Sequence, residues 1–290
     1  MNTQLLHTDG QVLAAVDLSE YAASVADHAA WAAERLGAGL TLLHVHDRES
    51  AADSRDLSGS LALGASEDLL AELATLDGQR AALAQKQARA LLDTLAVRTS
   101  ERGVTAAAQQ RHGALVDTLL ECEPGVRLFV IGKRGESADH ARGHLGAALE
   151  RVVRAVHRPV LVASRAFRPI ERFLIAFDGS PTTRKCVEMV CASPLLKGAA
   201  CHLVMAGSRD EAQRAHLQWA EACLREAGFE PSLHTADGSA ESVIAAHADS
   251  TRADLLVMGA YGHSRIRTLL VGSTTTQVLR QCKVPVLLLR

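Results

Sequence analysis

The sequence predicts an α/β protein made of two tandem domains, each built on a parallel β-sheet. The chain has 290 residues, and a prior of about 150 residues per domain gives two domains. Short apolar runs alternate with helical patterns along the whole chain, which is typical of a parallel sheet with helices on both faces. The second half then repeats the order of the first. With 48% hydrophobic and 22% charged residues, the chain has the composition of a soluble globular protein with an ample core.

In the first half, each expected strand is a short apolar run. The run at Val12–Val16 precedes Ser19, which we expect to be the N-cap of the following helix. Apolar residues then recur at helical spacing, at positions 22, 25, 26, 29 and 33. Later apolar runs predict three more strands, at Leu40–Val45, Leu128–Ile131 and Pro159–Ala163.

The second half repeats this order. The strand expected at Phe173–Phe177 is followed by Asp178 and Gly179, then by Ser180 as the expected N-cap and Pro181 as the first helical residue. Three further apolar runs match the later strands of the first half, at Cys201–Ala206, Asp254–Met258 and Pro285–Leu289.

The first half is longer than the second between its second and fourth strands. The extra residues fall near 47–100, a stretch that is first rich in Ser, Asp and Gly and then helical and rich in Ala, Leu and Gln. Within it, we expect Leu83–Leu95 to form a helix that packs on its domain, with a partner-binding helix as the alternative. We place the domain boundary within Arg165–Pro169, which gives domains at 1–168 and 169–290.

A candidate phosphate-binding loop follows the fourth strand of the second half. It contains Gly259 and Gly262, then nine residues, then Gly272-Ser273-Thr274 at the start of a helix. Glycines let the backbone pass close to a ligand, and the free N–H groups of a helix N-terminus bind anions. Ligands of open α/β sheets bind at the carboxyl ends of the strands, where this loop lies. The alternative is a capping box between Thr274 and Gln277, which needs no ligand.

The spacing Gly259-x2-Gly262-x9-Gly272-Ser273 resembles the nucleotide-binding signature of the ATP-binding universal stress protein family. The likeness continues through VMGAYGHSRIRTLLVGSTTTQVLRQCKVPVLLL, and the repeat extends it to nearly the whole chain. The resemblance implies two Rossmann-like domains of the adenine nucleotide alpha hydrolase-like type, each with a five-stranded parallel sheet of order 3-2-1-4-5. It also implies ATP, with or without Mg²⁺, in the second domain. Asp178 would lie at the nucleoside end and Ala206 against adenine, while the ribose and phosphates would contact Met258, Gly259, Gly262, His263, Gly272, Ser273 and Thr274.

The first half lacks parts of this loop. Its corresponding stretch ends in Gly146-Ala147-Ala148, so alanines stand where Ser273 and Thr274 have hydroxyl groups. Glu136 and Asp139 add negative charge where phosphates would lie. We therefore expect an empty or altered site in the first domain, although the nucleoside end keeps Asp17 and Val45.

Composition excludes several other functions. With 31 basic and 33 acidic residues, the chain has no field that would attract nucleic acid, and no apolar run is long enough to cross a membrane.

The N-terminus lacks the pattern of a signal peptide and the six cysteines show no CxxC spacing, so we expect a cytoplasmic protein with reduced thiols. Two histidine pairs have spacings that allow metal ligation but lack a third ligand in register, so we expect no metal site; they are His44 with His46 and His140 with His144.

The expected function is that of a cytoplasmic ATP-binding regulatory protein of the stress response, with the nucleotide in the second domain. Two alternatives remain: a scaffold or partner-binding protein that needs no nucleotide, and an enzyme, at most a slow ATPase. Against the enzyme, the sequence contains no G-x-x-x-x-G-K-[ST] loop and places no residue as a general base, so no catalytic residue is assigned.

The last strand of each domain is short, apolar and expected at a sheet edge. Unpaired apolar edges promote aggregation, so proteins pair or cover them. We expect Pro159–Ala163 and Pro285–Leu289 to lie antiparallel and cover each other, which would make the chain an intramolecular pseudo-dimer. A homodimer would then be an additional assembly, together with a protein partner that the sequence does not identify.

Overall fold

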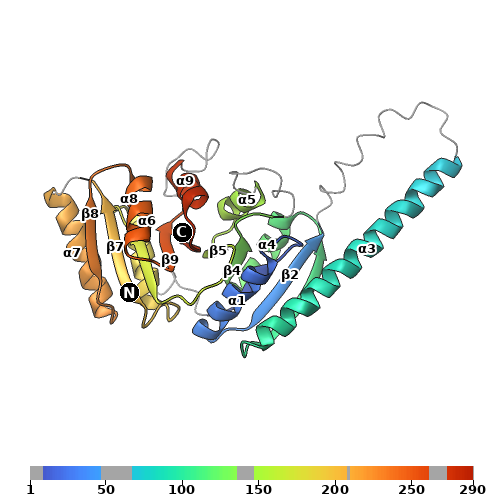
Figure 1. The fold of residues 1–290 in the computed structure, drawn as a ribbon, viewed down its shortest axis with the longest axis horizontal. Coiled ribbons are helices and arrows are strands. Elements are labelled where there is room, and N and C mark those ends of the chain that lie inside the picture. The colour runs from blue at the N-terminus through green and yellow to red at the C-terminus, as the bar shows by residue number, and fades with distance from the viewer. Residues whose placement is uncertain (1–8, 47–66, 136–146, 208–209, 261–272, 290) are drawn as a thin grey trace.

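The computed structural model describes residues 9–46, 67–135, 147–207, 210–260 and 273–289. Ten of its strands form one sheet with the order β3-β2-β1-β4-β5-β10-β9-β6-β7-β8 (Figure 1). Each half contributes five parallel strands in the order 3-2-1-4-5, and the two halves meet at their fifth strands. The predicted fold class is therefore confirmed.

The elements of the first half follow the predicted alternation of strands and helices. In chain order they are β1 (Gln11–Ala15), α1 (Ala22–Leu36), β2 (Leu40–His46), α3 (Glu67–Ser100), β3 (Ala106–His112), α4 (Leu115–Cys122), the 3₁₀ helix η3 (Glu123–Gly125), β4 (Val126–Gly132), α5 (Ala147–Ala155) and β5 (Val160–Ala163).

The second half repeats the pattern with shorter connections. Its elements are β6 (Arg172–Ala176), α6 (Pro181–Ala192), β7 (Ala200–Ala206), α7 (Glu211–Glu226), β8 (Ser232–Ala236), α8 (Ala240–Ser250), β9 (Leu255–Gly259), α9 (Ser273–Gln281) and β10 (Val286–Leu289).

The two predicted helix starts have different outcomes. Ser180 is the N-cap of α6, its side chain accepts from the Thr183 N–H, and Pro181 is the first helical residue, as predicted. The prediction for Ser19 is wrong, because the N-cap of α1 is Tyr21, which has no side-chain cap. The Ser19 hydroxyl instead accepts from the Tyr21 N–H at 3.3 Å, so it closes a turn that precedes the helix.

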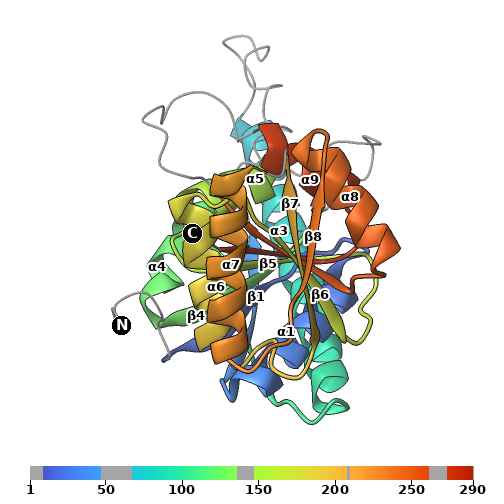
Figure 2. The same cartoon turned by 90° about the vertical axis from the view of Figure 1, so that its left-hand side faces the viewer.

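Helices cover both faces of the sheet. One apolar cluster unites the buried residues of α1, α3, α6 and α7 with one face of the strands, and a second cluster unites those of α4, α5, α8 and α9 with the other. Figure 2 shows α6 and α7 on one side of the strands of the second half and α8 and α9 on the other. Both clusters contain residues from both halves, so the hydrophobic core is continuous across the molecule.

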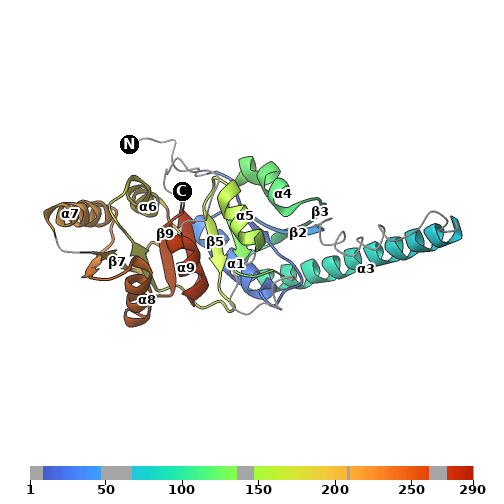
Figure 3. The same ribbon diagram turned by 90° about the horizontal axis from the view of Figure 1, so that it is seen from above.

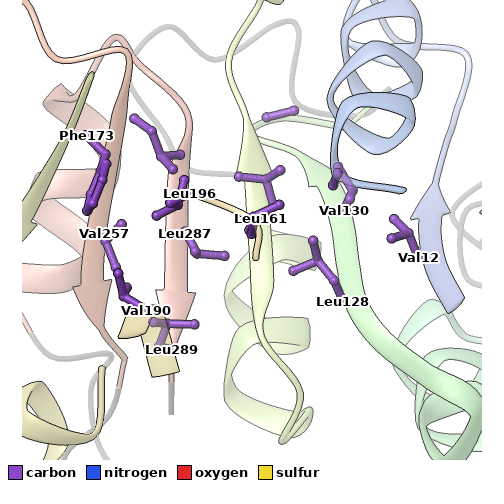
Figure 4. Close-up of a cluster of buried hydrophobic side chains, with 14 of the residues drawn as sticks. Val12, Leu128, Val130, Leu161, Phe173, Val190, Leu196, Val257, Leu287 and Leu289 are labelled. Carbon is purple, nitrogen blue, oxygen red and sulfur yellow. The ribbon is translucent and has the colours of Figure 1, made fainter. Parts of the chain in front are cut away.

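The two halves are joined by an antiparallel pair of edge strands. Leu287 of β10 lies opposite Leu161 of β5, and Leu288 lies opposite Val160. These four side chains are at most 4% exposed. Figure 4 shows Leu161 and Leu287 side by side in the middle of the core. The predicted antiparallel pairing of the two apolar edges is thus confirmed.

Helix α3 is 34 residues long, and of its described side chains, which start at Glu72, those that are buried on the domain lie in its C-terminal part. Ala88, Leu92 and Leu95 are buried, whereas Leu83 is 57% exposed. The prediction that Leu83–Leu95 is a packing helix is therefore confirmed from Ala88 onward and is wrong for Leu83. Among the described helices, α3 included, none is long and apolar enough to span a bilayer.

His28 of α1 is a fully buried histidine. Its Nδ1 lies 2.7 Å from the backbone oxygen of Ser24, and its Nε2 has no hydrogen-bond partner within the described part of the chain. Burial lowers the pKa of His28 below its usual value of 6.5. The folded protein therefore holds this ring neutral at a pH where the unfolded chain protonates it.

We expect acidification to destabilise the protein in the window just below pH 6.5. There the unfolded chain binds a proton at His28 that the folded chain does not, so the free energy of unfolding falls by up to about 1.4 kcal/mol per pH unit. Thermal unfolding at about pH 7 and pH 5.5 measures this loss, which should be smaller in His28→Gln. An equal drop in melting temperature in both proteins would contradict the assignment.

Candidate functional site

The candidate site lies at the carboxyl ends of β6, β7 and β9. In the sheet, β6 lies between β7 and β9, with Ala176 opposite Val204 on one side and Ile175 opposite Val257 on the other. The chain leaves β6 toward β7 and later returns to the opposite side of β6 as β9. Such a switch in strand order opens the crevice in which open α/β sheets bind their ligands.

Asp178 follows β6 at this edge. Its Oδ1 accepts hydrogen bonds from the Ser180 N–H at 2.9 Å and from the Thr183 hydroxyl at 2.7 Å. Partial burial raises the pKa of Asp178, but the hydrogen bonds from Ser180 and Thr183 outweigh this and hold the pKa below its ordinary value. The side chain is therefore an oriented, exposed carboxylate that can accept hydrogen bonds from a ligand.

Ala206 ends β7, and the chain turns away directly after it. Gly207 has a φ of +128°, and its N–H donates to the backbone oxygen of Ala236 at 3.0 Å. A Cβ on Gly207 would lie 2.5 Å from the Nε2 of Gln213, so the α7 side chain closes tightly over the end of β7. The Oε1 of Gln213 is buried and has no hydrogen-bond partner within the described ranges.

A second α7 side chain closes the neighbouring turn. Gly179 has a φ of +78°, and a Cβ there would lie 2.4 Å from the His216 ring. The His216 Nδ1 lies 2.6 Å from the Arg184 guanidinium, which also donates to the backbone oxygen of Gly179 at 3.1 Å. Helices α6 and α7 thus hold the Asp178 turn in place. These supporting residues could not be predicted from the sequence, in which the glycines at 179 and 207 are the only sign of close packing there.

Met258 and Gly259 end β9 next to β6. Met258 is buried, and a Cβ on Gly259 would lie 2.9 Å from the Thr182 methyl group of α6. Gly259 is therefore required for packing as well as for the predicted approach of a ligand. The structure brings four of the predicted site residues to one edge of the sheet: Asp178, Ala206, Met258 and Gly259.

The remaining predicted site residues belong to the loop and to the helix that follows it. Gly262, His263 and Gly272 lie outside the described residues, as do the side chains of Ser273 and Thr274. The backbone of Ser273–Gln281 forms α9, as the sequence predicted for this helix. In its first turns, the Thr276 hydroxyl is buried and makes no hydrogen bond to any described residue.

At the corresponding edge of the first half, the described residues of the loop make close contacts. A Cβ on Gly135 would lie 3.0 Å from the Oδ2 of Asp17, so the loop after β4 rests on this carboxylate. Lys133 of the same loop donates to the backbone oxygen of Cys282 in the other half, and burial lowers the pKa of its ammonium group. Helix α5 begins at Ala147, without a hydroxyl group. Glu136, Asp139 and Gly146 lie outside the described residues.

The described residues include two other groups of reactive side chains, the paired histidines and the cysteines. Over the described ranges, no cluster of three metal-ligating residues is present, although the rings of His44, His46 and His112 lie against one another. His140 and His144 lie outside these ranges. All six cysteines are free, and burial raises the pKa of Cys186 to about 12, so this thiol is not activated as a nucleophile.

Comparison with known proteins agrees with this architecture. A model of the universal stress protein family matches residues 10–164 and 169–290. A universal stress protein of Synechocystis is 38% identical over 284 residues, covering 96% of this chain and 99% of the relative. The crystal structure of a universal stress protein from Archaeoglobus fulgidus aligns over 96% of this chain and 98% of its own, with 20% identity and a TM-score of 0.71. Another universal stress protein, solved in complex with cAMP, covers 42% of this chain and 98% of its own, with 25% identity and a TM-score of 0.37.

Proposed function

Because this chain belongs to the universal stress protein family, we propose that it is a cytoplasmic regulatory protein of the stress response that binds one ATP in residues 169–290. The observation that carries the proposal is the difference between the two halves. In the second half an oriented carboxylate at Asp178 stands at the edge where Gly259 begins the glycine loop. In the first half the helix after the corresponding loop starts with Ala147 and Ala148, where α9 starts with Ser273 and Thr274.

In this proposal each part of the second-half site has a role. Asp178 accepts hydrogen bonds from the nucleoside, and the backbone of Ala206 lies against adenine. Gly262, Gly272, Ser273 and Thr274 surround the phosphates with N–H groups and hydroxyls at the N-terminus of α9. Met258 and His263 line the ribose and the phosphates. Mg²⁺, where it takes part, enters with the phosphates, which are its preferred ligands alongside water and carboxylates.

The free thiols of all six cysteines fit a reducing compartment, which supports the proposed location in the cytoplasm. The proposal assigns no general base, so it predicts binding of ATP with at most slow turnover. The alternative is a scaffold that needs no nucleotide, in which Thr274 and Gln277 only cap α9.

Equilibrium dialysis with ATP separates the two functions. We expect wild-type protein to bind ATP and Asp178→Asn to bind it about tenfold more weakly, since a hydrogen bond to a charged group contributes about 1.5–3 kcal/mol. Asparagine keeps an oxygen that can accept from Ser180 and Thr183, so the turn should survive. Asp17→Asn is the matched control at the equivalent position and should leave ATP binding unchanged. Absence of ATP binding by wild-type protein would favour the scaffold.

A further inference from the structure

The N-terminal part of α3 is not covered by any other described part of the chain. Every residue from 72 to 87 is exposed, and packing on the domain begins only at Ala88. At 1.5 Å per residue, the helix is about 51 Å long. Figures 1 and 3 show it reaching well beyond the sheet and the other helices. This projecting segment adds nothing to the nucleotide site proposed above.

The projecting segment carries an apolar stripe. Leu73, Leu76 and Leu83 are 42%, 44% and 57% exposed. Their spacing of three and then seven residues places them at the a and d positions of one heptad register, and Val97 falls in the same register. The buried residues of α3 occupy other heptad positions, so they lie on a different face of the helix; they are Ala88, Leu92, Leu95 and Thr99. A heptad stripe on an uncovered helix is the pattern of a helix that pairs with another helix.

Charge is distributed unequally along α3. Residues 67–79 contain Glu67, Asp68, Glu72 and Asp77 and no basic residue. Residues 80–100 contain four basic residues and one acid; these are Arg80, Lys86, Arg89, Arg98 and Asp93. Two copies of this helix therefore attract each other when they run antiparallel and repel each other when they run parallel.

We propose that a second copy of this chain covers the stripe, with the two α3 helices antiparallel about a twofold axis near Gly78. Such an isologous contact is the commonest way in which identical chains assemble. In this register Leu73 lies opposite Leu83 of the second copy, and Leu76 lies along the apolar stem of its Arg80. The helices overlap over residues 68–88, so the overlap ends where α3 begins to pack on its own domain.

The same register pairs opposite charges. Glu72 lies across from Lys86 of the second copy on one flank of the stripe, and the twofold axis generates this pair twice. Asp77 lies near the axis, where Arg80 of its own helix, 4.0 Å away, offsets its charge. A parallel pair would instead place Glu72 beside Glu72.

Light scattering and sedimentation of the full chain test the proposal. We expect a particle of twice 30.8 kDa at tens of micromolar and a monomer for the double variant Leu73→Glu/Leu83→Glu. At a concentration where both proteins are monomeric, their melting temperatures should be equal, because Leu73 and Leu83 are exposed and lie outside the core. Leu120→Glu, at an exposed leucine of α4, is the matched control and should remain a dimer. A monomeric wild-type protein, or a dimer that the double variant leaves intact, would overturn the proposal.

Charge reversal tests the antiparallel register. Either Glu72→Lys or Lys86→Glu places like charges opposite each other twice, so each should weaken the dimer by about tenfold. The double variant Glu72→Lys/Lys86→Glu restores opposite charges and should bring the dimer dissociation constant back close to that of wild type. Additive weakening in the double variant would contradict the antiparallel pairing.

Discussion

Replacing Leu288 with aspartate should destabilise the protein by about 4 kcal/mol or more, the largest effect we expect from a single substitution. Leu288 is 2% exposed and lies opposite Val160, where the two halves meet. The substitution removes a buried leucine, which costs about 2–5 kcal/mol, and places a carboxylate in a dry contact. Since domains of this size are stable by only about 5–15 kcal/mol, the substitution should remove a large fraction of the free energy of unfolding. Urea unfolding measures the change.

The matched control is Leu120→Asp. Leu120 is 36% exposed on α4, so the same change of side chain there should alter the free energy of unfolding by about 1 kcal/mol or less. Equal stabilities of Leu288→Asp and Leu120→Asp would show that β5 and β10 do not pair in solution. The apolar clusters on both faces of the sheet pass through this pair of strands, so neither half has a complete core without the other.

Replacing Gly262 with valine should remove most of the affinity for ATP, which is the largest functional effect that we expect. Glycine lets the backbone approach a bound phosphate, whereas a β-branched side chain occupies that space. A ligand present at about 100 times its dissociation constant stabilises the folded state by about 2.7 kcal/mol. Wild-type protein should therefore melt at a higher temperature when ATP is added, and the variant should show almost no shift.

The melting temperature without nucleotide is the internal control for this variant. It should stay close to that of wild type, because the predicted loss is in binding and not in folding. An ATP-induced shift as large in Gly262→Val as in wild type would contradict the phosphate loop and would leave the capping box as the explanation of the Ser/Thr cluster.

The strands in the interior of the sheet could be predicted from the sequence, and the outer strands could not. Continuous apolar runs such as Phe173–Phe177 arise because both faces of an inner strand are buried. The edge strands Ala106–His112 and Ser232–Ala236 have mostly exposed or half-buried side chains. Because little of their surface is buried, polar residues are tolerated there: Gln, Arg and His in Ala106–His112, and Ser, His and Thr in Ser232–Ala236. Neither strand shows the long apolar run of an inner strand.

The site could be predicted where local chain geometry determines it. Asp178 and Gly259 follow directly after apolar strands, so their place at the edge of the sheet follows from the sequence. Thr183, Gln213 and His216 could not be predicted, because they reach this edge from helices whose orientation depends on tertiary packing. The same limit applies to α3, where periodicity identified a helix but did not show that it extends beyond its domain.

We expect one nucleotide to bind per chain, in the second half only. Calorimetric titration of purified, nucleotide-free protein with ATP measures the number of sites. A single class of sites with one ATP per 30.8 kDa chain is expected, since α5 of the first half begins with alanines where α9 begins with Ser273. Two equivalent sites per chain, or no binding, would contradict it.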